Sequence, residues 1–220
     1  MIGGRKMPNW VNVGMTISGE VKELKRFRDF AKSDMTMSGK PYTDDKGNKC
    51  FYVIASHNFI PYPEKYAKYD REPKTEVVIE RGTPNGKPSR RKKTFRYTDG
   101  FNMGGYEWCD KHWGSKWGIC DAYLDHEDYT KGEAHLVYTF QSPWSFPTPL
   151  LVKMSKMFPK LEFSCEMDEE SFEFIGEMIF KAGKITYDDT HKPSCAELVE
   201  AGLLDEEQAE EYYGKDWRKK

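Results

Sequence analysis

Four residues have types and a spacing that could bind zinc: Cys109, His112, Cys120 and His126. They form the pattern C-x2-H-x7-C-x5-H, and cysteine and histidine side chains bind zinc tetrahedrally. Structural zinc sites, however, usually take two ligands from each of two knuckles, whereas Cys120 and His126 lie on or next to an expected strand. Cys109 is expected on the buried face of a short helix. We therefore expect no metal site and no cofactor.

Other catalytic patterns are missing from the sequence or have simpler explanations. No cysteine lies at a glycine-flanked turn beside a histidine, and no Gly-x-Ser-x-Gly motif occurs, so a nucleophilic enzyme has no support. The acidic run at 168–170 could bind a divalent metal, but hairpin turns are commonly acidic for solubility. The sequence also has no phosphate-binding glycine loop. It therefore predicts a protein that is not an enzyme.

Charged residues are distributed unevenly, although the net charge is only -2. Residues 65–96 contain eleven Lys or Arg against four Asp or Glu, and residues 197–216 contain eight acids against one lysine. Such segments can steer a partner, and a basic hairpin can enter a nucleic-acid groove or contact an acidic protein. Alternatively, they are solvated surfaces, and the basic strand is an edge that prevents aggregation. The expected partner-binding residues are Lys87, Arg90, Arg91, Lys92, Lys93, Arg96, Glu206, Glu207, Glu210 and Glu211.

Tryptophan is concentrated in residues 105–118, which hold three tryptophans within ten positions and have glycines at both ends. Together with Trp144, these rings could stack nucleobases. The expected strands lack the sequence signature of ferredoxin-like RNA binders, so packing is the favoured interpretation. In that interpretation Trp113 and Trp117 pin a glycine-kinked loop onto a sheet, and Trp144 covers the mouth of the core.

The spacing of apolar residues predicts the elements that must position these side chains. Alternation favours strands, and a three-to-four-residue period favours helices. Residues 50–55 are expected to form a short buried strand or the wall of a core. The other expected elements, in chain order, are a strand (10–18), a helix (20–31), a hairpin (75–81 and 90–97, with an Asn-Gly turn), a helix (105–113), two strands (120–125 and 134–140), a helix (150–158) and two strands (161–167 and 172–181).

This order predicts an α+β fold: a ferredoxin-like βαββαβ sandwich with an extra strand. We expect the sandwich to occupy residues 1–183, with an insertion at 64–101 that carries the basic hairpin. Residues 184–220 are expected to form an acidic tail of two short helices, one of them with Asp205 and Gln208 in capping-box positions.

Several segments, in this order along the chain, carry a resemblance to a known family. They are Met-Pro-Asn-Trp-Val-Asn at 7–12 leading to Ile-Ser-Gly at 17–19, Asn-Phe-Ile-Pro-Tyr-Pro at 58–63, the tryptophan-rich stretch 105–118, Gln-Ser-Pro-Trp-Ser-Phe-Pro at 141–147, and a final strand pair with Phe-Ile-Gly-Glu at 174–177 and Phe180.

In these segments the chain resembles the YubB ferredoxin-like family, a domain of unknown function carried by phages, plasmids and other mobile elements. The resemblance covers residues 7–64 and 102–183, so the basic hairpin and the acidic tail lie outside it. It implies a ferredoxin-like fold and a mobile-element origin, and it supplies no catalytic residues.

Composition and resemblance together give the expected function. The chain has five scattered cysteines and no apolar run of the roughly 18 residues that span a bilayer, and its first six residues lack the apolar core of a secretory signal. We expect a phage or mobile-element accessory protein in the host cytoplasm. It would bind a host protein or ribonucleoprotein complex and inhibit a nucleic-acid-targeting defence complex, in the manner of anti-CRISPR or anti-restriction proteins. The alternative is a non-specific nucleic-acid-binding protein that uses the hairpin and exposed aromatics.

Overall fold

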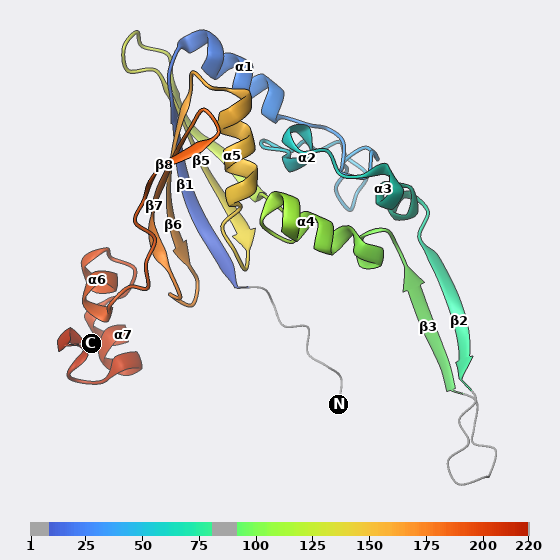
Figure 1. Ribbon diagram of the computed structural model, residues 1–220. Helices are drawn as coiled ribbons and strands as arrows, with labels where there is room; N and C mark the ends of the chain where they lie inside the picture. Colours follow the sequence, from blue (N-terminus) through green and yellow to red (C-terminus); the bar gives the residue numbers. More distant parts are fainter. Residues whose placement is uncertain (1–8, 81–91, 220) are drawn as a thin grey trace.

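Six antiparallel strands form the main sheet, in the order β4-β5-β1-β6-β7-β8 (Figure 1). The structure is a computed structural model and describes residues 9–80 and 92–219. The strands are β1 (Trp10–Ser18), β4 (Cys120–Asp128), β5 (His135–Pro143), β6 (Glu162–Glu169), β7 (Ile175–Lys181) and β8 (Lys184–Asp188). With helices α1 (Val21–Ala31) and α5 (Thr148–Met157), the four strands β4-β5-β1-β6 have the order and connections of a ferredoxin-like sandwich. The expected α+β, ferredoxin-like fold is confirmed.

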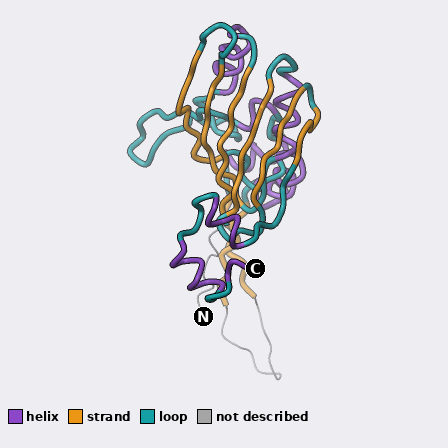
Figure 2. Tube along the Cα trace, turned by 90° about the vertical axis from the view of Figure 1, so that its left-hand side faces the viewer, coloured by secondary structure: helices purple, strands orange, loops and turns teal. Residues whose placement is uncertain are grey.

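One face of the sheet packs against α1 and α5, and its alternation follows from the sequence. In β1 the odd-numbered residues from Val11 to Ile17 are buried, while Asn12, Gly14 and Thr16 are exposed. Phe27 of α1 lies at the centre of this layer, with four rings packed around it (Phe59, Tyr138, Phe158 and Phe163). Figure 2 looks onto the sheet with these helices behind it. Within residues 9–80 and 92–219, no helix packs across the opposite face of the sheet (Figure 2).

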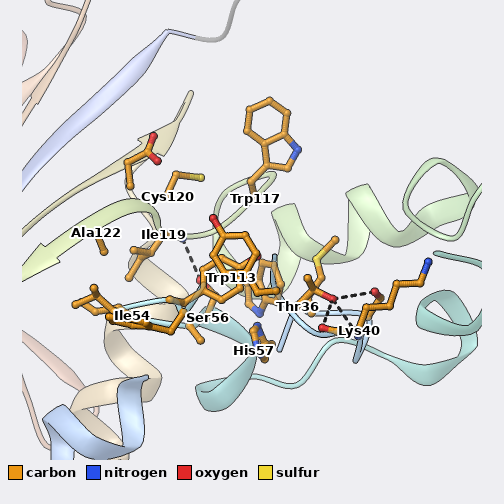
Figure 3. Close-up of a pocket in the computed structure, with 18 of the residues that line it drawn as sticks. Thr36, Lys40, Ile54, Ser56, His57, Trp113, Trp117, Ile119, Cys120 and Ala122 are labelled. Carbon is orange, nitrogen blue, oxygen red and sulfur yellow. Dashed lines mark hydrogen bonds between the residues drawn. The ribbon is translucent and has the colours of Figure 1, made fainter. Parts of the chain in front are cut away.

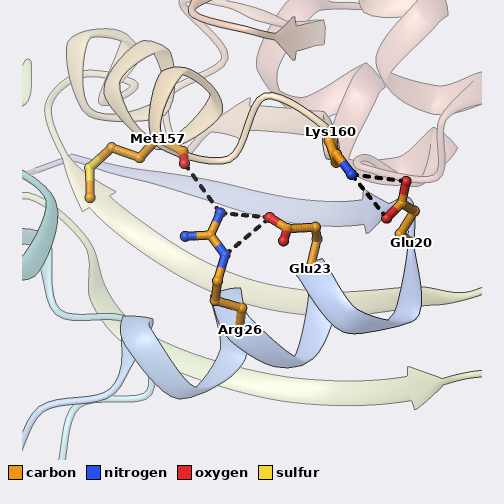
Figure 4. A network of polar contacts seen from close by, with 5 residues as sticks. All are labelled: Glu20, Glu23, Arg26, Met157 and Lys160. Atoms are coloured by element: carbon orange, nitrogen blue, oxygen red, sulfur yellow. Dashed lines mark hydrogen bonds and ion pairs between the residues drawn. The ribbon is translucent and has the colours of Figure 1, made fainter.

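Polar contacts fix α1 against the end of α5 (Figure 4). Arg26 bonds to Glu23 at 2.6 Å and donates to the Met157 carbonyl at 3.4 Å, and its guanidinium lies 4.1 Å from the centre of the Phe158 ring. Lys160 donates to Glu20 at 3.3 Å. These contacts bridge the first turns of α1 to the turn that follows α5, so they set the position of one helix relative to the other.

The whole segment between α1 and β4 lies outside the main sheet. It contains α2 (Ser56–Phe59), α3 (Glu64–Arg71), the separate two-stranded sheet of β2 (Lys74–Glu80) and β3 (Lys92–Thr98), a π-helical turn (Phe101–Gly105) and α4 (Tyr106–Trp113). The β2–β3 ribbon projects away from the main sheet (Figure 1). The sequence predicts this ribbon and α4, but not the short helices α2 and α3.

The segment 50–55, expected as a strand or as a core wall, is a core wall. Its only strand-like pairing in the described chain is the isolated bridge between Tyr52 and Ser33. Ile54 and Ala55 are nevertheless buried, and Ile54 belongs to the main core.

The sequence predicts one extra strand, and this number is wrong. Two strands, β7 and β8, extend the ferredoxin-like sheet beyond β6. β8 follows β7 through Ala182 and Gly183, whose φ values are 50° and 82°. This is the geometry of a tight two-residue hairpin, which the Ala-Gly pair signals less clearly than Asn-Gly would. All five residues of β8 are exposed, so its short alternation of Ile185 and Tyr187 with polar residues does not mark a buried face.

After the sheet, α6 (Cys195–Glu200), α7 (Glu206–Tyr213) and a 3-10 turn (Trp217–Lys219) form a small helical segment beside it (Figure 1). Both helices begin with complete capping boxes, at Ser194 and at Asp205; the sequence predicts the second of them. Cys195, Ala209 and Trp217 form a hydrophobic cluster separate from the main core. No helix within residues 9–80 and 92–219 is long and apolar enough to cross a membrane.

Candidate functional site

Three tryptophans from distant parts of the chain meet at one end of the sheet. The ring centroid of Trp117 lies 6.1 Å from that of Trp10 and 6.1 Å from that of Trp144. Lys116 completes the group, with its ammonium nitrogen 5.3 Å from the Trp117 ring centroid and 4.8 Å from that of Trp144. We call Trp10, Lys116, Trp117 and Trp144 the tryptophan platform.

Two glycines turn this part of the chain outward. Gly114, which ends α4, and Gly118 have φ values of 81° and 69°, in the left-handed region that favours glycine. At Gly118 an added Cβ would collide with the Ser56 side chain. Between them, buried Ser115 donates to the Pro143 carbonyl at 3.2 Å. This contact fixes the loop to the end of β5 and leaves the following Lys116 and Trp117 at the surface.

The platform corrects part of the packing interpretation of the tryptophans. Trp113 is buried as expected, and its indole donates to the Ile60 carbonyl at 2.9 Å. Trp117 and Trp144, expected to pin a loop and to cover the core, are 39% and 43% exposed. Their rings contact each other and Lys116 instead of the core, so they form a surface and not a lid. Trp108 is half-buried and stacks on His112 at 4.4 Å.

The backbone at Trp144 is strained. Its φ is 63°, a left-handed conformation that costs a residue with a Cβ roughly 1–2 kcal/mol. Its N–H donates to the Asn9 carbonyl at 2.8 Å, which holds the residue in place. Strain of this kind persists only where the surrounding structure enforces it, and it concentrates at functional sites. Here the strain displays a large aromatic ring to solvent.

Charges of both signs border the platform. Lys116 lies over the rings on one side, and its nitrogen is also 4.9 Å from the centre of the Tyr106 ring. On the other side, the acidic turn after β6 is bonded to Trp10: the Trp10 N–H donates to the Glu170 carboxylate at 3.2 Å, and the Glu170 N–H donates to the Trp10 carbonyl at 2.8 Å. The platform is therefore aromatic at its centre, with one cation and an acidic turn at its margins.

Sequence reasoning missed Lys116 and Trp10 as members of this site. Trp10 had a readable signal, because it is even-numbered in a strand whose odd-numbered residues 11–17 carry the buried set. A residue out of phase with the apolar face of a strand points to the other face. Lys116 had no such signal, since only the fold brings the rings of Tyr106 and Trp144 to it.

Beside the platform, a pocket of about 910 Å³ opens between residues 36–57 and the start of β4 (Figure 3). Trp117 belongs to both sites, because it also lines the pocket. The pocket walls are rich in aromatic residues, including Tyr52, Phe101 and Trp113. This size and composition are those of small-molecule sites, which span roughly 300–1,000 Å³.

Burial affects the cysteine and the histidine of the pocket. Burial, and secondarily the charge of Asp121, raises the pKa of the Cys120 thiol to about 12, so the thiol stays protonated and unreactive at neutral pH. Burial lowers the pKa of His57, whose Nε2 lies 3.2 Å from the Ser33 hydroxyl. Cys120 is therefore not activated as a nucleophile.

The four residues with zinc-like types do not come together as ligands. Cys109 is buried in the main core, where burial, then Asp70 and Asp110, raise the pKa of its thiol to about 12. The ring of His112 is hydrogen-bonded to the backbone of Trp108, because its Nδ1–H donates to the Trp108 carbonyl oxygen at 2.8 Å. Within the described part of the chain, no three His, Cys, Asp or Glu side chains are grouped to hold a metal ion.

The predicted partner-binding residues fall into two sets that are far apart in the chain. Lys87, Arg90 and Arg91 lie outside the described residues. Of the others in the hairpin, the structure gives the backbone, with Lys92, Lys93 and Arg96 of β3 opposite Glu80, Ile79 and Glu76 of β2. The acidic residues Glu206, Glu207, Glu210 and Glu211 are exposed on α7, and Glu206 is paired with Arg218 at 2.7 Å.

A family model is similar to part of the chain. The model described as "Ferredoxin-like domain in Api92-like protein" matches residues 121–213, from the start of β4 to the end of α7. The match therefore includes both tail helices. This finding supports a ferredoxin-like family; the finer assignment to the YubB family stays a prediction.

Among solved structures, a crystal structure of the protein Api92 from Yersinia pseudotuberculosis is similar to this chain, with a TM-score of 0.47 and 10% sequence identity. The alignment covers 85% of this chain and 98% of that one. No curated protein matches the chain significantly.

Proposed function

We propose that this protein acts by binding a protein partner through the tryptophan platform. The exposure of Trp117 and Trp144 around Lys116 is the observation that carries the proposal. Tryptophan, tyrosine and arginine dominate the binding energy of protein interfaces, and here three indole rings are grouped on one surface instead of being scattered singly. The strained backbone of Trp144 supports the same conclusion, because the strained conformation holds the ring at the surface.

The charges around the platform favour a protein over a nucleic acid. A phosphate backbone would meet the acidic turn that is bonded to Trp10, and like charges would repel it. The open face of the sheet, which ferredoxin-like RNA binders use for stacking, places Glu166 opposite Glu177, while Glu162 is paired with Lys181. Its central polar contacts are the hydrogen bonds of Asn12 with Asp168 and Gln141, at 2.8 and 2.9 Å.

The more detailed function follows from the family resemblance in the sequence. A YubB-like accessory protein of a phage or mobile element would bind a host protein or ribonucleoprotein complex in the cytoplasm, without catalysis of its own. Inhibition of a nucleic-acid-targeting defence complex is the form of this proposal that the mobile-element context favours. The basic hairpin and the acidic residues of α7 would then steer the partner toward the platform.

A pulldown with matched variants tests the platform. The tagged full chain and two variants would be used on host lysate with nuclease treatment: Trp117→Ala/Trp144→Ala, and the control Tyr212→Ala. Tyr212 is 68% exposed, lies on α7 and is not a member of the platform. We expect one dominant protein to bind the wild type and the control, and to be lost by roughly tenfold or more from the double variant, as for hot-spot residues.

Two outcomes would contradict the proposal. Equal recovery of the protein with the double variant would move the interface elsewhere. Recovery of nucleic acid alone, lost as salt rises, would support the alternative of a nucleic-acid-binding protein. In that case, neutralising Lys87, Arg90, Arg91, Lys92, Lys93 and Arg96 should abolish the binding.

A further inference from the structure

We infer that the pocket beside the platform binds a small organic cation, a flat amidinium or guanidinium group in particular. This inference is independent of the protein partner proposed above, although Trp117 borders both sites. It rests on the shape of the pocket, its aromatic walls and the sign of its charges.

Aromatic residues line the pocket. Tyr52 stacks on Tyr42 with ring centroids 4.3 Å apart and meets the His57 ring edge-on, so its orientation is fixed before a ligand arrives. Trp117 is exposed at the pocket, and Trp113 lies behind the wall, buried and fixed by its hydrogen bond to Ile60. Flat cations bind favourably over such faces because the ring quadrupole is negative there.

Negative charge predominates along the pocket. Asp70, Asp99 and Asp121 line it against one lysine, Lys40, and a histidine whose pKa is lowered by burial. Lys40 donates to the backbone carbonyl of Asp70 at 3.5 Å, and within the described chain it forms no ion pair with an aspartate of the pocket. Neighbouring Arg71 is directed to Glu64 and to the Ser38 carbonyl.

Two of these carboxylates are held by neutral donors of the chain. Both oxygens of buried Asp99 accept from Asn102, at 2.7 and 2.8 Å. Asp70 accepts from the Phe101 N–H through Oδ1 at 2.8 Å, and its carboxylate also lies beside the hydroxyl of Tyr62. Neutral donors hold these carboxylates without cancelling their charge, so the wall attracts a cation and disfavours an anion.

Three ligands of nearly the same shape separate charge from shape: benzamidine as the cation, benzamide as the neutral form and benzoate as the anion. Titration of the full chain by calorimetry should show binding of benzamidine roughly tenfold or more tighter than benzamide, the scale of a charge-assisted contact, and no binding of benzoate. Asp70→Asn should remove that preference, because it keeps the Oδ1 acceptor for Phe101 and removes the charge. The matched control is Asp45→Asn, an exposed aspartate of the same segment that does not line the pocket.

The wild-type protein provides a second readout that needs no variant. The indole N–H signals of Trp113 and Trp117 should shift with benzamidine in a ¹⁵N NMR titration, and the signal of Trp217, in the C-terminal helices, should not. Equal affinity for benzamide and benzamidine would overturn the charge argument. Absence of binding by all three ligands, or shifts confined to Trp217, would overturn the site itself.

Discussion

Two hydrophobic clusters of the described residues each contain a buried tryptophan, and they differ greatly in size. Among the described residues, Trp113 lies in the main core with most of the buried side chains, whereas Trp217 belongs to a small cluster whose other buried members are Cys195 and Ala209. The main core is built from the sheet, α1, α4 and α5, and the small cluster from α6, α7 and the final turn. The comparison teaches that these parts can open separately, since cooperative units follow contiguous packing.

Truncation of Trp113 should have the largest effect on stability. Trp113→Ala removes a buried ring and the hydrogen bond to Ile60, so the free energy of unfolding should fall by about 3–5 kcal/mol. Urea unfolding followed by circular dichroism measures it. The control is Trp117→Ala, four residues along and 39% exposed, which should cost less than about 1 kcal/mol. Equal losses in the two variants would contradict the division between core and platform.

Truncation of Trp217 should have an intermediate and local effect. Trp217→Ala removes the largest member of a three-residue cluster, so α6 and α7 should open while the sheet stays folded. Hydrogen exchange followed by mass spectrometry should then show faster exchange in residues 195–219 and unchanged exchange in β1, β5 and β6. Tyr212→Ala, which removes an exposed ring from the same segment, should change neither. Faster exchange throughout the sheet would instead make the helices part of the main cooperative unit.

The elements that the sequence predicts well are those with strong local signals. The alternation of β1 and the capping pairs Ser194–Glu197 and Asp205–Gln208 depend on neighbouring residues alone, so a sequence pattern is enough to find them. β8 alternates Ile185 and Tyr187 with polar residues, but it has only five residues and none of them is buried. It forms because β7 offers an unpaired edge after a tight turn, which no local pattern records.

The candidate sites were harder to predict because they depend on distant contacts. The types and spacing of Trp108, Trp113 and Trp117 drew attention to the right segment, yet they could not tell which ring is buried. That is decided by the left-handed turns at Gly114 and Gly118 and by the bond from Ser115 to Pro143. The pocket likewise joins residues 36–57 to β4, a juxtaposition that only the folded chain creates.

The smallest predicted effect concerns the junction between the two clusters, where His191 lies. Its backbone pairs with Ile175 of β7, and its Nε2 is 3.4 Å from the Glu197 carboxylate of α6. The hydrogen bond to the Asp189 carbonyl, followed by the charge of Glu197, raises the pKa of His191 above its ordinary value of 6.5.

Because the pKa of His191 is higher in the folded protein, protonation of His191 stabilises the folded state of α6 and α7. The contribution should be complete below about pH 6.5, the ordinary histidine pKa, and should disappear as the pH rises through the folded value. Exchange protection of α6 and α7 relative to His191→Gln should therefore be greater at about pH 5.5 than at about pH 8.5, on either side of that pKa. The effect should be small, because the side chain is exposed to solvent. A His191 pKa at or below 6.5 in an NMR titration, or a difference from His191→Gln that grows with pH, would show that the junction does not depend on this proton.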